Sequence, residues 1–126
     1  MVCNFRVFND SCSGIISRRG IGIIDTRRLG SLPDILLMLS ASTHWTEQDL
    51  EGMQQWLATY VNWLINSPHG KDEAVHGNNH TTWYFAQIVP LALYLDQKDR
   101  ADSLAKAGLP LIIGEMIEKI GGSIVF

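Results

Sequence analysis

The segment after Thr46 has the most clearly defined helix start in this chain. Thr46 is a favourable N-cap residue, and Asp49 follows three residues later, where its carboxylate completes an approximate capping box. One apolar stripe then recurs at helical spacing, formed by Leu50, Met53, Leu57, Tyr60, Val61 and Leu64. We expect the helix to end near Asn66, because Pro68 disfavours helical geometry at the residue before it. A long helix with one wide apolar face must pack against other elements, so this segment favours a helical fold.

Three further segments also have a helical pattern. Apolar residues recur every three or four positions between residues 27 and 40, where Ser31 is the expected cap and Pro33 fits the first turn. A helix that starts between Asn79 and Thr82 is apolar on most sides and contains Pro90, at which we expect a kink. The segment from residue 98 to residue 120 is expected to be a helix that is interrupted at 108–110 and stopped by Gly121 and Gly122.

The remaining segments lack this pattern. Residues 1–24 read as extended or loop structure with one short strand at most, because β-branched residues alternate with glycines there. Residues 67–79 read as a polar loop, since they contain Pro68, Gly70 and Gly77 among mixed charges. Together the pattern predicts an all-α fold built from helices joined by loops.

Size and charge limit the class of protein. With 126 residues the chain forms a single domain, and no apolar run is long enough to span a bilayer. No signal peptide is recognisable. Residues 1–30 contain five arginines and two aspartates, whereas the rest of the chain is acidic, and the net charge is −3. This basic segment is either a solvated surface or a face for an anionic ligand. We expect neither nucleic-acid nor membrane partners.

The motif most typical of a functional site runs from Asn78 to Tyr84, with the sequence NNHTTWY. Asn79 and His80 lie at a helix start, where backbone N–H groups and the helix dipole favour an anion such as a carboxylate. The alternative is that Asn79 only caps the helix and His80 is a satisfied, partly buried histidine. Trp83 lies on the face of His80 and could stack on a sugar ring. Tyr84 points about 100° away, so only one of these two aromatics can line a cleft with His80.

A metal site is the main alternative chemistry for this region. His76 and His80 are four residues apart, and His69, Asp72 and Glu73 are nearby in the sequence. Gly77 and the two asparagines between the histidines argue against one continuous helix, and the chain has no HExxH motif. It also lacks the GxSxG motif of serine hydrolases. We therefore expect no metal and no cofactor.

Three segments of the chain resemble the alginate lyase family of polysaccharide lyases. They are residues 20–27 (GIGIIDTR), residues 63–70 (WLINSPHG) and residues 78–84 (NNHTTWY), and the resemblance covers about residues 14–105. It implies part of an α/α toroid of antiparallel helical hairpins. It also implies β-elimination of a uronic-acid polymer such as alginate or a related polyuronate, and a periplasmic or secreted location.

The resemblance also implies roles for individual residues. In the family an Asn-His pair donates hydrogen bonds to the uronate carboxylate, and this catalytic role carries over to Asn79 and His80. His80 could also act as the base for some substrate configurations. The residues expected to contact the anionic polysaccharide are Arg27, Asn78, Trp83 and Tyr84.

The chain departs from the family pattern at several points. Thr81 replaces a usual glycine, and Phe85 stands where an aspartate is common. The family takes a catalytic tyrosine and an arginine from a downstream segment. None of Tyr60, Tyr84 and Tyr94 matches the motif of that tyrosine. We therefore expect residues 1–126 to form a single partial domain that self-associates through exposed apolar faces. The alternative function is an inactive remnant that binds polyuronates or serves as a helical interaction module.

Overall fold

The computed structural model describes residues 20–119, with side chains described as far as residue 114. A 3₁₀ helix, η1, is followed by five α-helices, and this part of the chain contains no strand. The elements are η1 (Gly20–Ser31), α1 (Leu32–Leu39), α2 (Glu47–Asn66), α3 (Pro68–Ala74), α4 (Asn79–Tyr94) and α5 (Lys98–Lys119). The prediction of an all-α fold is confirmed.

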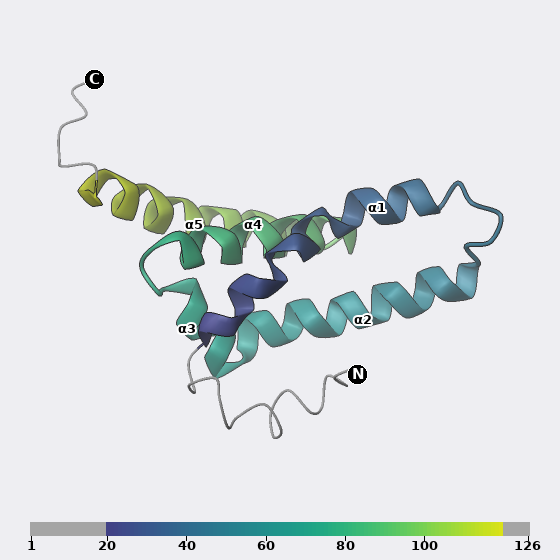
Figure 1. Cartoon of the computed structure of the whole chain (residues 1–126), viewed down its shortest axis with the longest axis horizontal. Helices are drawn as coiled ribbons and strands as arrows, with labels where there is room; N and C mark the ends of the chain where they lie inside the picture. Colours follow the sequence, from purple (N-terminus) through teal and green to yellow (C-terminus); the bar gives the residue numbers. More distant parts are fainter. Residues whose placement is uncertain (1–19, 120–126) are drawn as a thin grey trace.

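Consecutive long helices run in opposite directions (Figure 1). The chain runs outward along α1 and returns along α2, and α5 returns alongside α4 (Figure 1). Helix α4 contacts every other element, whereas α5 packs mainly against α4. This arrangement agrees with the antiparallel hairpins expected of part of an α/α toroid.

Helix α2 begins and ends where the sequence predicts. The Thr46 hydroxyl accepts a hydrogen bond from the Asp49 backbone N–H, and the Asp49 carboxylate accepts one from the Thr46 N–H. This capping box satisfies donors that a helix start would otherwise leave without partners. The helix ends at Asn66, and Ser67 is extended with ψ of 152°, as a residue before proline prefers.

Several local predictions are wrong. Residues 20–24 form the start of η1 rather than a loop or strand, whereas residues 1–19 lie outside the described part of the chain. Contacts of η1 with α3 and α4 stabilise this 3₁₀ geometry. The Ser31 side chain makes no capping hydrogen bond to α1. It donates instead to the Arg28 carbonyl, three residues earlier.

The two interior prolines do not end their helices. Helix α4 continues through Pro90, and α5 is continuous across residues 108–110, where an interruption was expected. At residue 108 the two helices approach closely, since Gly108 lies directly against the Phe85 ring and leaves no space there for a side chain. The predicted stop at Gly121 and Gly122 lies outside the described residues.

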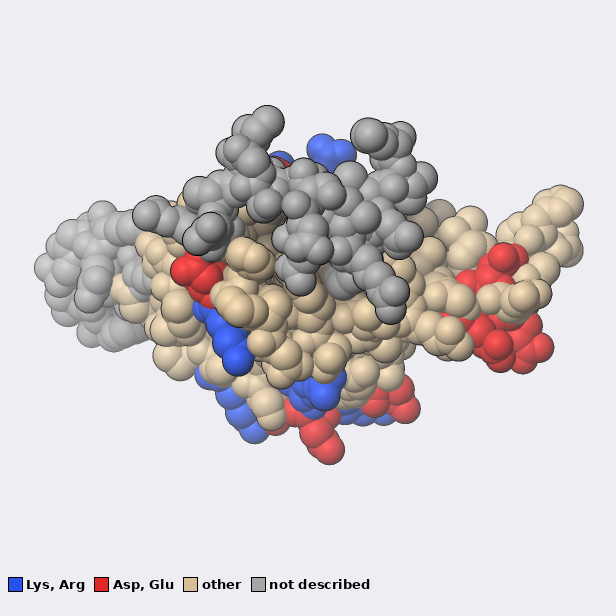
Figure 2. Space-filling view, turned by 90° about the horizontal axis from the view of Figure 1, so that it is seen from below, with Lys and Arg blue, Asp and Glu red and all other residues tan. Residues whose placement is uncertain are grey.

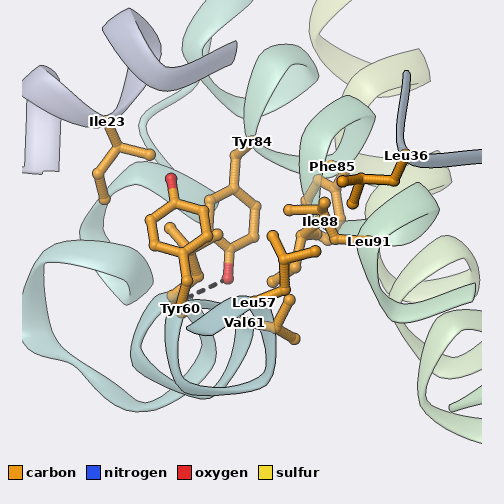
Figure 3. Packing of buried hydrophobic residues seen from close by; sticks show 10 residues of the cluster. Ile23, Leu36, Leu57, Tyr60, Val61, Tyr84, Phe85, Ile88 and Leu91 are labelled. Atoms are coloured by element: carbon orange, nitrogen blue, oxygen red, sulfur yellow. Dashed lines mark hydrogen bonds between the residues drawn. The ribbon is translucent and has the colours of Figure 1, made fainter. Parts of the chain in front are cut away.

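The core lies where α2 and α4 face each other, with contributions from η1 and α1 (Figure 3). Its buried members are Ile23, Leu36, Leu57, Tyr60, Val61, Leu64, Tyr84, Phe85, Ile88 and Leu91. Burial of this apolar area provides the main driving force for folding. Helix α4 is therefore held on several sides, and its first turn has a fixed position.

Other apolar side chains remain exposed. On α1 they are Ile35, Leu37, Met38 and Leu39, and on α5 they are Leu109, Leu111 and Ile113. The predicted self-association through such faces stays a prediction. Within the part of the chain that the structure describes, no helix combines the length and the apolar character needed to cross a membrane.

Candidate functional site

Helix α3 was predicted as part of a loop, and it brings the functional residues of this region together. Pro68 occupies the first turn, and the Ser67 hydroxyl accepts a hydrogen bond from the Gly70 N–H at 3.0 Å. The following turn contains Gly77, whose φ of 83° is a conformation that glycine adopts without strain. The Gly77 N–H donates to the Thr81 hydroxyl at 3.1 Å, which fixes the turn onto α4.

This turn places His80 against Glu73, a residue that the sequence suggests only as a neighbour in the alternative metal site. The His80 Nδ1 atom lies 2.8 Å from the Glu73 Oε1 atom. The Glu73 side chain is 0% exposed and the His80 side chain is 17% exposed. The pair therefore connects a buried carboxylate to an imidazole that reaches the surface. His80 follows Glu73 by seven positions, and no spacing rule for helices or strands links them across the turn at Gly77.

The two asparagines at the start of α4 have different roles. The Asn78 side-chain oxygen accepts a hydrogen bond from the His80 backbone N–H at 2.8 Å, so Asn78 caps the helix. Asn79 is therefore not the cap, whereas the second part of that alternative, a partly buried His80 with a hydrogen-bond partner, agrees with the structure. Asn79 is the first residue of α4 and is exposed. The amide group of Asn79 thus stands at the helix start next to His80.

Trp83 and Arg27 come together although they are far apart in the sequence. The Arg27 guanidinium carbon lies 5.8 Å from the centre of the Trp83 ring, within the range of a cation–π contact. Arg27 belongs to η1 and is exposed, and Trp83 is 41% exposed one turn after His80 on α4. An exposed flat ring with a guanidinium beside it is a suitable surface for a carboxylated sugar.

Tyr84 lies in the core and not at the surface. Its side chain is 3% exposed, and its hydroxyl donates to the Leu64 carbonyl oxygen at 3.0 Å (Figure 3). This position does not fit the prediction that Tyr84 contacts a polymer. Of the two adjacent aromatics, Trp83 is the one available to a ligand.

Burial changes the ionisation of the two core tyrosines. Burial raises the pKa of Tyr84 to about 12, and the neighbouring Tyr60 adds to this shift. Burial also raises the pKa of Tyr60, although a hydrogen bond with Thr26 opposes the effect. The Tyr60 hydroxyl lies 2.7 Å from the Thr26 hydroxyl and donates to Gln87 at 3.1 Å. Both phenols therefore stay protonated at neutral pH.

The raised pKa of Tyr84 predicts a loss of stability in alkaline solution. The stabilisation is fully present below about pH 10, the usual pKa in an unfolded chain, and is lost as pH rises toward the folded value of about 12. We expect Tyr84→Phe to be less stable than wild type at pH 8 by about 1 kcal/mol, because it loses one buried hydrogen bond. The difference should shrink above pH 10. Urea unfolding of both proteins at several pH values measures this, and a constant difference would contradict the prediction.

An acidic surface lies at the end of α2 that is remote from the candidate site. Acidic side chains gather where α2 begins (Figure 2), and Glu47, Asp49 and Glu51 in its first turns are all exposed. Helix α3 follows the opposite end, about 30 Å away for a helix of this length. The acidic end therefore lies far from His80.

Among the described residues, no group of three or more His, Cys, Asp or Glu side chains is placed to hold a metal ion.

Comparisons with known proteins identify the type of domain. The sequence profile described as alginate lyase matches residues 2–118. The crystal structure of an alginate lyase from Bacteroides ovatus is similar, with a TM-score of 0.72 and 27% sequence identity. The match covers 77% of this chain and 26% of that chain, so this chain spans about a quarter of its length. A comparison with curated proteins gives no match.

Proposed function

This chain belongs to the alginate lyase family, and on that premise we propose that it acts on a uronic-acid polymer as part of a polysaccharide lyase. The proposed reaction is β-elimination, in which a base removes the C5 proton and an acid protonates the departing glycosidic oxygen. The proposed setting is periplasmic or extracellular, where such polymers are found.

Asn79 and His80 are proposed to neutralise the uronate carboxylate. Removal of the C5 proton places further negative charge on this group, and hydrogen-bond donors aimed at it stabilise the transition state. The start of α4 adds backbone N–H groups and the positive end of the helix dipole. The observation that carries the proposal is the 2.8 Å contact between His80 and the buried Glu73, which holds the imidazole at the helix start.

Arg27 and Trp83 are proposed to bind a sugar unit beside this group. The exposed Trp83 ring offers a flat apolar face to a pyranose ring. Arg27, at 5.8 Å from the ring centre, could pair with a uronate carboxylate through its guanidinium donors. Asn78 contributes indirectly, because its side-chain oxygen already caps α4.

A second candidate function is binding of polyuronates without cleavage. The chain contains three tyrosines, and the hydroxyls of Tyr60 and Tyr84 are buried in hydrogen bonds inside the core. Tyr94 is partly buried against the same core. The groups that the described residues place at the start of α4 are therefore those of Asn79 and His80, which suit carboxylate binding, and this supports the second candidate.

A cleavage assay combined with a binding assay distinguishes these functions. The chain is incubated with alginate, polymannuronate or glucuronan, and the unsaturated uronate product is followed by its ultraviolet absorbance. Binding of short uronate oligomers is measured by calorimetry, with a neutral glucan as the control. Product formation supports the lyase, and binding without product supports the second function. Neither product nor binding would contradict both and would leave a helical interaction module.

A further inference from the structure

We propose that Glu73 is the positioning residue of His80, and that it holds Nδ1 so that Nε2 is the ring atom presented to a ligand. Only one part of this inference, the role of Nε2 toward a ligand, rests on the proposed function. The hydrogen bond between Glu73 and His80 is a property of the folded chain and is testable without any substrate.

The burial of Glu73 is the first argument. Its side chain is 0% exposed and its Oε1 atom lies 2.8 Å from His80 Nδ1. Its second carboxylate oxygen, Oε2, is buried and has no hydrogen-bond partner within the described chain. A buried carboxylate without compensation is costly, and His80 supplies the compensating donor.

The neighbouring acid on α3 has a different partner. Asp72 accepts a hydrogen bond from the Gly20 backbone N–H at 2.8 Å, which attaches the start of η1 to α3. Glu73 points instead toward α4, where the Thr81 hydroxyl also contacts the Glu73 carbonyl at 3.5 Å. The ring of His76 also lies beside His80, with 5.0 Å between the two ring centres. Glu73 is therefore the acid that orients His80.

The proposed pairing implies one tautomer. With Glu73 as the acceptor, His80 carries its proton on Nδ1, because an ionised carboxylate has no hydrogen to donate. Neutral His80 then has a lone pair on Nε2 and serves as a base, whereas protonated His80 presents an N–H donor to a uronate carboxylate. Both roles require the same ring orientation, and Glu73 imposes it.

Nitrogen NMR of the histidine rings tests the inference directly. The intact chain is labelled with ¹⁵N-histidine, and the His80 signals are assigned by their loss in His80→Asn, since the chain has four histidines. In the wild type we expect neutral His80 to carry its proton on Nδ1 alone. In Glu73→Gln we expect the loss of this exclusive form and a mixture of tautomers, because a side-chain amide can either accept or donate.

Glu51→Gln is the matched control, because Glu51 is exposed on α2 and the chemical change is the same. It should leave the His80 signals unchanged. Neutral His80 protonated on Nε2 in the wild type, or an unchanged tautomer in Glu73→Gln, would overturn the inference. If circular dichroism shows that Glu73→Gln does not fold, the wild-type spectrum alone decides. Failure to bind or cleave polyuronates would count against the proposed function and leave this result intact.

Discussion

Under the proposed lyase function, His80→Ala is expected to lower the rate of β-elimination roughly 10²–10³-fold, the usual effect of removing one donor that stabilises a developing charge. If the chain binds polyuronates without cleaving them, the same variant should weaken binding about tenfold, since one charge-assisted hydrogen bond is lost. Product absorbance measures the first effect, and calorimetry with uronate oligomers measures the second. Both follow from the position of His80 at the start of α4.

The same variant should also be less stable, because it leaves Glu73 buried without its donor. We expect a loss of about 1–3 kcal/mol, the cost of a buried polar group that loses its partner. The double variant His80→Ala/Glu73→Gln removes the buried charge, so it should recover part of the stability and none of the function. Urea unfolding and the activity assay of the same preparations separate the two effects.

His44→Ala is the control for the loss of a histidine side chain, since His44 is exposed in the loop before α2. It should retain both stability and function. A double variant that regains function together with stability would show that His80 acts through the fold and does not contact the polymer.

The helix starts are the part of the fold that local sequence predicts best. Thr46 and Asp49 determine the start of α2 through two hydrogen bonds within three residues, so no distant contact is needed. Pro68 likewise determines its end. Helix α3 was missed although Ser67 and Pro68 form a typical cap and first turn, because two glycines suggested a loop.

Continuity of α5 could not be predicted from local sequence. Gly108 and Pro110 are unfavourable in an isolated helix, and the contact of Gly108 with Phe85 of α4 becomes visible only in the folded chain. The 3₁₀ geometry of η1 has the same origin, since it depends on contacts with α3 and α4.

The candidate site was predicted in part. The NNH motif correctly indicates a helix start, yet two adjacent asparagines leave open which one is the cap, and the structure selects Asn78. Arg27 and Trp83 were separate candidates, and their contact depends on the packing of η1 against α4. The pairing of Glu73 with His80 was not predicted, because it depends on a turn whose geometry the sequence indicates only through Gly77.

Gly70→Ala is expected to destabilise the fold by about 3 kcal/mol, at the upper end of the usual cost of overpacking. An added Cβ atom at this buried position would overlap with the backbone of Leu64, in the last turns of α2. Side chains can rotate away from such an overlap, but backbone atoms cannot move without shifting a whole helix. The variant must therefore displace α3 from α2. Because α3 carries Glu73, this shift should also disturb the contact between Glu73 and His80.

Gly52→Ala is the same substitution at an exposed position, and we expect it to have the opposite effect on stability. Gly52 is exposed in α2, and no atom lies within 4 Å of the added Cβ, so the change should stabilise the helix by about 0.5–1 kcal/mol. Urea unfolding of both variants measures the two free energies, and the ¹⁵N signals of His80 report whether Glu73 has moved. A Gly70→Ala protein as stable as wild type would contradict the close packing of α3 against α2 at Gly70. A destabilised variant with unchanged His80 signals would separate the packing of α3 from the orientation of His80.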